Sequence, residues 1–141
     1  MLFRSDLAKW EAAEADSRRT ADLDTARDAR AHVERMNRQL IRLSALPPGP
    51  AYPYPVTIGR LGTALWVLVP GELYQVFQTT LRSRFLNEAV VVATLTNDWQ
   101  PGYLPATSAY GHGIYQETIA VVAAGGLETL TETVARELRA L

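Results

Sequence analysis

The sequence predicts an α+β fold with an α/β-like order of elements, and three observations predict it. Residues 5–46 contain no glycine or proline and are rich in alanine, arginine, glutamate and leucine, which favour helix. Residues 47–55 are rich in proline, which cannot continue a helix. Beyond them, β-branched runs alternate with apolar residues at helical spacing. We therefore expect a long N-terminal helical arm (1–46), a proline-rich connector (47–55) and an α/β segment (56–141) in the order β-β-α-β-loop-α.

The arm carries its apolar residues on one helical face. Ser5-Asp6 is a typical helix start, and the later apolar residues alternate steps of three and four, as in a coiled-coil seam. Residues 16–25 are polar nearly all round, so the arm is either one long helix or two helices that meet near residues 22–24. We interpret His32, which lies beside the seam, as an ordinary surface residue. The predicted seam consists of Ala26, Ala29, Val33, Met36, Leu40 and Leu43.

In the α/β segment, residues 56–60 and 63–69 predict two strands joined around Leu61-Gly62. The second strand is nearly all apolar, which predicts burial on both faces. Residues 89–95 form the most apolar run of the chain and predict a central strand. Two amphipathic helices are expected as well, one with Leu73, Val76, Phe77, Leu81 and Phe85 on its apolar face, and one after Gly125-Gly126 with Leu127, Leu130, Val134, Leu138 and Leu141.

Composition excludes several classes of function. The 141 residues have a formal net charge of −1, and their basic residues are mixed with acids, so nothing indicates a nucleic-acid partner. Without cysteine there is no disulfide, thiolate zinc site or cysteine nucleophile. No apolar run approaches the ~18 residues of a transmembrane helix, and residues 1–9 lack the pattern of a secretory signal. The composition is typical of a soluble globular protein, and its localisation stays open.

Polar and aromatic residues gather in residues 97–117, between glycines and prolines. Long ordered loops of this composition are commonly functional. Glu72 follows the other buried strand, where α/β folds place ligand-contacting groups, although a glutamate in the first turn of a helix is also favoured by the helix dipole alone. In the loop, Trp99 is more typical of a packing residue than of a substrate platform, and His112, between two glycines, is more typical of a loop tip than of a ligand.

These residues resemble the neutral/alkaline, non-lysosomal ceramidases, which are zinc-dependent hydrolases of N-acyl amide bonds in sphingolipids. The likeness covers roughly residues 54–141. It follows the pattern of a strand, Pro-Gly-Glu ending at Glu72, an amphipathic helix, an apolar strand, Asn97, and then the spaced tyrosines Tyr103, Tyr110 and Tyr115.

The resemblance implies roles for three of these residues. Glu72 and Tyr103 match metal ligands of the family, and Tyr115 matches the tyrosine that assists at the substrate carbonyl. Tyr110 falls where the family also has tyrosine. The segment between Asn97 and Tyr103 is one residue longer than expected, so the loop follows its own path there. We regard Asn97, Trp99, Tyr110 and His112 as candidate loop and substrate residues.

The resemblance also shows what this chain lacks. The family's zinc site uses two histidines from an earlier part of a longer chain, and neither His32 nor His112 matches them. A catalytic zinc has at least three protein ligands besides its water. We therefore expect the chain to correspond to the C-terminal part of a ceramidase-like catalytic domain, with zinc as cofactor of the intact enzyme. Alone it should bind no zinc tightly and hydrolyse no amide.

Two classes of function stay open. In the first, the chain is a segment of an amidohydrolase whose partners are the remainder of the catalytic domain, or a second copy, and an N-acyl amide substrate such as a sphingolipid. In the second, it is a non-catalytic module whose helical arm mediates oligomerisation or partner binding. Under the first, residues 64–69 and 89–95 should have exposed edges and apolar faces, so the isolated chain should associate.

Overall fold

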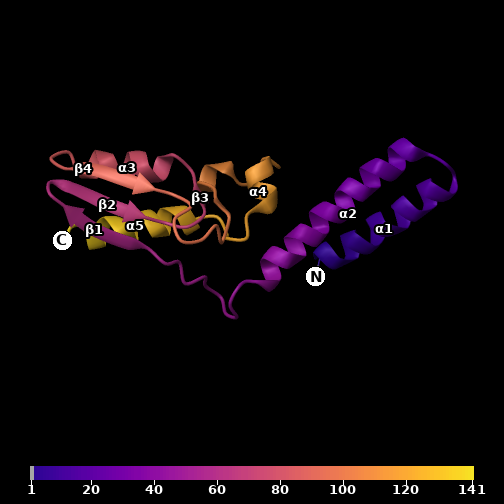
Figure 1. Cartoon of the computed structure of the whole chain (residues 1–141), viewed down its shortest axis with the longest axis horizontal. Helices are drawn as coiled ribbons and strands as arrows, with labels where there is room; N and C mark the ends of the chain where they lie inside the picture. The colour runs from indigo at the N-terminus through magenta and orange to yellow at the C-terminus, as the bar shows by residue number, and fades with distance from the viewer. Residues whose placement is uncertain (1) are drawn as a thin grey trace. The chain divides into compact units, whose positions relative to one another are not determined.

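The computed structural model describes residues 2–141 and confirms the α+β class. The chain forms two compact units, Met1–Pro47 and Pro48–Leu141. The first is helical, and the second combines strands and helices (Figure 1). Among the residues described, no helix is both long and apolar enough to span a membrane.

The helical arm is two helices rather than one. Helix α1 (Leu2–Arg19) is followed by α2 (Leu23–Ser44), and the two pack as a hairpin (Figure 1). Asp22 caps α2, because its Oδ1 accepts the backbone N–H of Thr25 at 3.1 Å. The polar segment 16–25, which was compatible with one helix or two, therefore contains the turn between α1 and α2. The expected start at Ser5-Asp6 is wrong by one turn, since α1 already includes Leu2.

The seam of α2 is only partly as predicted. Ala26, Ala29 and Val33 are buried, whereas Met36, Leu40 and Leu43 are half-buried. The polar Gln39 is buried near the end of α2, where the apolar spacing had pointed to its neighbour Leu40. Small side chains in the buried part let the two helix backbones approach closely.

His32 is not an ordinary surface residue. Its imidazole stacks on the indole of Trp10 with the ring centroids 3.9 Å apart and the planes inclined by 8°. Because Trp10 belongs to α1 and His32 to α2, the stack joins the two helices, which sequence spacing within one helix could not reveal.

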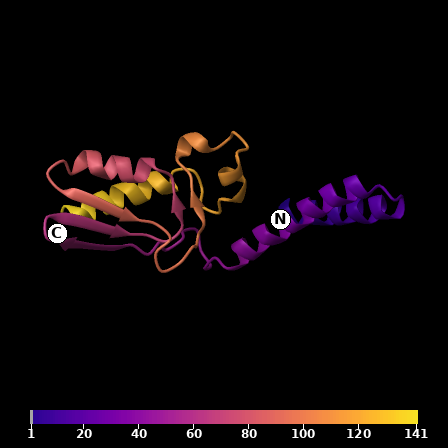
Figure 2. The ribbon, with the colours of Figure 1, turned by 45° about the horizontal axis from the view of Figure 1, so that its top comes forward.

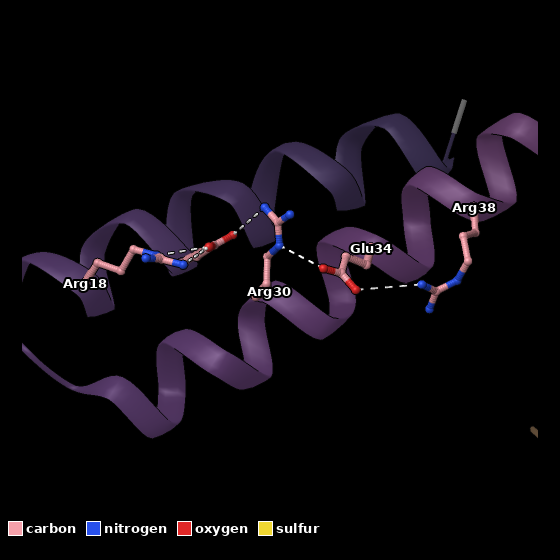
Figure 3. A network of polar contacts seen from close by, with 5 residues as sticks. Arg18, Arg30, Glu34 and Arg38 are labelled. Atoms are coloured by element: carbon pink, nitrogen blue, oxygen red, sulfur yellow. Dashed lines mark hydrogen bonds and ion pairs between the residues drawn. The ribbon is translucent and has the colours of Figure 1, made fainter.

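Charged residues also join the same two helices. Glu14 of α1 contacts Arg18 at 2.9 Å and reaches Arg30 of α2 at 3.9 Å, and Arg30 also pairs with Glu34 at 3.0 Å. Figure 3 shows this network extending to Arg38. The Arg30–Glu34 pair is exposed, and such pairs add about 0–1 kcal/mol each, whereas the Glu14 side chain, which links the two helices, is only 13% exposed.

The second unit is built on a three-stranded sheet of order β1-β2-β4, with β1 (Thr57–Leu61), β2 (Ala64–Leu68) and β4 (Ala89–Ala93). Strand β1 pairs antiparallel with β2, and β4 pairs parallel with β2. The expected central position of the β4 run is wrong for residues 2–141, because β2 is central and β4 is at the edge.

Helices α3 (Val76–Arg84) and α5 (Gly126–Leu138) lie on one face of this sheet (Figure 2). The core lies between the helices and the sheet, where alternate strand residues meet the apolar helix faces. It contains Leu65, Val67, Val69, Phe77, Leu81, Phe85, Val90, Leu104, Leu127, Val134, Ala135 and Leu138.

The other face of the sheet carries no helix of this unit. The register places Trp66 between Gly59 of β1 and Val91 of β4 on that face. Trp66 is 37% exposed and Leu61, at the end of β1, is 71% exposed. The prediction that β2 is buried on both faces is therefore wrong, since a run of apolar residues cannot tell which face has a cover.

Residues 97–117 are an ordered excursion containing several short elements. These are β5 (Tyr103–Leu104), the 3₁₀ helix η1 (Thr107–Ala109) and the beginning of α4 (Tyr115–Ile119). Strand β5 pairs in parallel with β3 (Glu72–Leu73), which precedes α3. Leu73, expected in the helix, belongs to this strand.

Candidate functional site

The β3–β5 pair brings two predicted site residues side by side. The register aligns Glu72 with Tyr103 and Leu73 with Leu104. Two backbone hydrogen bonds fix this register: Glu72 N donates to Gly102 O at 2.8 Å, and Tyr74 N donates to Leu104 O at 3.2 Å. In parallel strands, aligned residues direct their side chains to the same side. The phenol of Tyr103 and the carboxylate of Glu72 therefore face one another.

The turn before Glu72 depends on Gly71. Its φ of +69° is one that residues with a Cβ rarely adopt. A Cβ there would also lie 2.6 Å from the carbonyl oxygen of Gly102. The backbone of Gly71 donates to Asp98 O at 3.3 Å and accepts from Leu95 N at 3.1 Å. The Pro-Gly-Glu motif thus allows the loop backbone to approach β3 closely.

Tyr54 of the connector supports the same turn. Its hydroxyl donates a hydrogen bond to the carbonyl oxygen of Pro70, and burial raises the pKa of Tyr54 above its ordinary value. The hydrogen bond of Tyr54 could not be predicted from the sequence, because a tyrosine among prolines has no periodicity that indicates a partner. In the sequence, Tyr54 only marks where the resemblance begins.

The Glu72 and Tyr103 side chains interact electrostatically. A hydrogen bond with the Glu72 carboxylate raises the pKa of the Tyr103 phenol, and desolvation and the charge of Glu72 act in the same direction. Tyr103 therefore keeps its proton at neutral pH and can donate it toward Glu72. The pair presents an anionic carboxylate and a phenol hydroxyl, three oxygen atoms in all, at a partly exposed place.

Tyr115 completes the cluster. Its ring meets that of Tyr103 edge to face, with centroids 6.1 Å apart and planes inclined by 74°. Tyr115 is 64% exposed, so its hydroxyl is accessible to a ligand. The three residues that the resemblance selected, Glu72, Tyr103 and Tyr115, therefore lie together although they come from β3, β5 and α4.

Tyr110 has a different position. Its hydroxyl donates to the carbonyl oxygen of Val122 at 2.7 Å, and burial is the main cause that raises the pKa of Tyr110. The hydroxyl is thus committed to holding the loop onto the segment before α5. Tyr110 therefore has a structural hydrogen bond in this fold. A role for Tyr110 in substrate binding stays a prediction.

The remaining candidates lie on exposed loop segments. Asn97 has a φ of +66°, and the Trp99 carbonyl accepts Gly102 N at 2.8 Å in the turn that leads into β5. The backbone N–H of His112 is bonded to Glu117. Within residues 2–141, none of these three takes part in the contacts that join Glu72, Tyr103 and Tyr115.

The donor set of the cluster fits half of a zinc site. Carboxylate and phenolate oxygens can ligate zinc, but a catalytic zinc takes three protein ligands and a water. Among residues 2–141 there is no group of three or more His, Cys, Asp or Glu side chains that could hold a metal ion. Glu72 and Tyr103 alone therefore do not complete a site.

A cavity of about 330 Å³ lies beside the start of α3. It adjoins β3, because Leu73 is one of its walls, and it reaches the carboxyl end of β4 at Thr94. Its walls carry no formal charge and are formed by Leu73, Tyr74, Gln75, Phe77, Gln78, Val92 and Thr94.

Comparison of the chain with protein-family models, with curated proteins and with solved structures found no match.

Proposed function

We propose that this chain is a segment of a zinc-dependent amidohydrolase resembling the neutral ceramidases, which cleaves an N-acyl amide bond of a lipid. The observation that carries the proposal is the convergence of Glu72, Tyr103 and Tyr115 from three separate elements. Their residue types and chain order are those of the motif in the resembled family. Their proximity supports a common role.

In this proposal, Glu72 and Tyr103 supply two of the metal ligands, and the others come from residues outside this chain or from a second copy. Zinc, when bound, supplies an acidified water and polarises the amide carbonyl. Tyr115 donates a hydrogen bond from its exposed hydroxyl to the carbonyl oxygen as negative charge develops there. The edge-to-face contact with Tyr103 shows that Tyr115 lies beside the proposed ligands.

The proposal is tested by metal analysis and amidase assay of the 141-residue chain and of the full-length product of its gene. We expect the chain alone to lose zinc on dialysis and to show no turnover. The full-length product should retain zinc and hydrolyse an N-acyl amide. Stoichiometric zinc in the isolated chain, lost on Glu72→Gln, would contradict the proposal, because it would show that these 141 residues hold a complete zinc site.

Three tyrosine variants of the full-length product separate the roles. Tyr115→Phe should lower kcat by roughly 10²- to 10³-fold, as for one oxyanion donor, with zinc retained and KM little changed. Tyr103→Phe should lose zinc first. Tyr110→Phe is the matched control, because its hydroxyl bonds to Val122, and it should change stability rather than metal content. Small and equal effects of Tyr103→Phe and Tyr115→Phe would refute the site.

A non-catalytic role is the second proposal, and the helical hairpin favours it. The hairpin forms a compact unit with its own buried residues, a stacked His32–Trp10 pair and an ion-pair network. A module that binds a partner through this hairpin would need no zinc. Deleting residues 1–47 from the full-length product separates the two proposals. If the chain is part of an amidohydrolase, the deletion variant should keep amidase activity. If the hairpin is a binding module, the variant should lose partner binding.

A further inference from the structure

We propose that Glu117 is a positioning residue that holds Tyr115 against the Glu72–Tyr103 pair. This inference rests on the proposed function for its catalytic meaning, whereas the positioning itself is a property of the fold. Glu117 lies two residues after Tyr115 in α4, and no motif in the sequence pointed to it.

The Glu117 carboxylate closes the loop that precedes Tyr115. One oxygen, Oε1, accepts the backbone N–H of Gly111 at 2.7 Å. The other, Oε2, accepts the N–H of Gly113 at 2.7 Å and that of His112 at 3.1 Å. Three consecutive N–H groups thus converge on one carboxylate, an arrangement in which charge-assisted hydrogen bonds are strong.

The two glycines make this convergence possible. Gly111 has a φ of +86° and Gly113 a φ of +65°, while a Cβ built at either position would meet nothing within 4 Å. Backbone conformation, and not space, is therefore the reason for glycine at both positions. The Glu117 carboxylate is negatively charged at neutral pH, and the N–H of Gly111 holds its pKa below the ordinary value.

Hydrogen bonds within α4 also lie near Tyr115: Thr118 donates from its hydroxyl to Tyr115 O at 2.8 Å and from its N–H to Ile114 O at 3.0 Å, and these fix the helix backbone rather than the ring. On the N-terminal side of the loop, the Tyr110 hydroxyl is bonded to Val122 O, and on its C-terminal side Ile119 is buried. Between these two anchors, residues 111–115 are exposed. The edge-to-face contact of Tyr115 with Tyr103 is a weak interaction. The carboxylate clamp therefore decides where the Tyr115 ring lies.

The test is NMR spectroscopy of the 141-residue chain, with Glu117→Gln and Glu117→Asp as variants. A glutamine has one acceptor oxygen in place of two, and an aspartate keeps the charge but is one methylene shorter. We expect Glu117→Gln to speed amide hydrogen exchange at Gly111, His112 and Gly113 by at least about tenfold, because these amides would lose charge-assisted hydrogen bonds. The cross-relaxation between the Tyr103 and Tyr115 rings should disappear, with Glu117→Asp intermediate.

Glu128→Gln is the matched control. Glu128 also accepts a backbone N–H through its carboxylate, that of Thr107 at 2.8 Å, but it belongs to α5. This variant should speed exchange at Thr107 and leave the Tyr103–Tyr115 cross-relaxation in place. Unchanged ring contacts in Glu117→Gln would overturn the proposal. Loss of the circular dichroism of the folded unit in both Glu117 variants would also overturn it, because Glu117 would then be a residue of global stability.

In the full-length product, Glu117→Gln should lower kcat with zinc and KM retained, and the Glu117→Gln/Tyr115→Phe double variant should be no slower than Tyr115→Phe alone. Such non-additivity is the signature of a residue that acts through another. If the full-length product proves to have no amidase activity, the proposed function fails while the NMR result still decides the positioning role.

Discussion

Gly71 meets two separate demands, a positive φ and the close approach of Gly102. Gly62, in the turn between β1 and β2, has a similar φ of +62° but open space where a Cβ would be. We expect Gly62→Ala to cost about 1–2 kcal/mol, the usual penalty for a left-handed residue with a Cβ. Gly71→Ala should cost that amount plus the clash at 2.6 Å, in total at least about 3 kcal/mol. Urea unfolding followed by tryptophan fluorescence measures both, and equal costs would show that the close approach carries no strain.

The titration of Tyr103 reports directly on the candidate site. The neighbouring carboxylate disfavours the phenolate, so the pKa of Tyr103 is raised, and Glu72→Gln should lower it towards the ordinary tyrosine value. NMR of the tyrosine ring carbons as a function of pH gives the value for each tyrosine. Tyr110 is an internal control, because burial is the main cause of its raised pKa and should persist in the variant. If Glu72→Gln leaves the Tyr103 titration unchanged, the two side chains do not interact in solution.

Among individual residues, Glu72, Tyr103 and Tyr115 were predicted from the sequence as parts of one site, and the fold brings them together. Their spacing in two glycine- and proline-rich segments carried that information through the resemblance. Glu117 and Tyr54 were missed for a physical reason. Each acts by a side-chain hydrogen bond to a backbone group, with Gly111 or with Pro70, and such a contact leaves no periodic pattern in the chain.

At the scale of elements, the hairpin of α1 and α2 depends on small residues in its contact. Ala29 is 2% exposed between the helices, whereas Ala31 on the same helix is exposed. Ala29→Leu should therefore overpack the contact and cost about 1–3 kcal/mol. Ala31→Leu, which adds the same side chain to the open face, should be nearly neutral.

Hydrogen exchange followed by mass spectrometry checks this on peptides from α1 and α2. Ala29→Leu should speed exchange there by about 5- to 150-fold, the equivalent of 1–3 kcal/mol. Exchange in the sheet, in a separate compact unit, should not change. A hairpin that exchanges equally fast with leucine at either position would show that the two helices do not pack through Ala29.

The elements that sequence predicted well are those with enough residues to show a period. Strands β1, β2 and β4 and helices α3 and α5 all appear near their expected bounds. Strands β3 and β5 have two residues each and were missed, because a two-residue strand has no alternation to detect. What makes them strands is the tertiary backbone bonding of Glu72 and Tyr74 to the loop. The candidate site is built on these two strands, so its geometry could not be derived from periodicity.

For the whole molecule, the arrangement of layers is the property that sequence left least determined. Apolar strands predicted a buried sheet, and one face is indeed covered by α3 and α5. On the opposite face Leu61 and Trp66 are exposed and Val91 is half-buried, and the strand residues of this face are uncharged. Whether a strand has one covered face or two depends on segments distant in sequence. This surface is available for association of the isolated chain.

We expect the isolated 141-residue chain to associate into dimers or higher oligomers through this face. A surface of apolar strand residues around an exposed tryptophan gains free energy when it is removed from water, at roughly 25 cal/mol per Å². The outer edge of β4 has no strand partner among residues 2–141, and only its Val90 carbonyl is bonded by a side chain, that of Arg82 at 3.1 Å, so the edge favours pairing with another chain. Light scattering over a range of concentrations should show a mass above that of the 15.6 kDa chain.

A double variant tests whether this face is responsible. Trp66→Thr together with Val91→Thr places a β-branched residue, which favours strand, at both positions while replacing apolar surface with polar. It should shift the association at least about tenfold towards monomer, since one buried large side chain is worth about 1.5–3 kcal/mol. Leu86→Thr is the matched control, because Leu86 is 85% exposed but lies outside the three strands, and it should leave the association unchanged. If the unaltered chain is a monomer at high micromolar concentration, the bare face is stable in water by itself. The expectation that further segments or copies cover it would then be wrong.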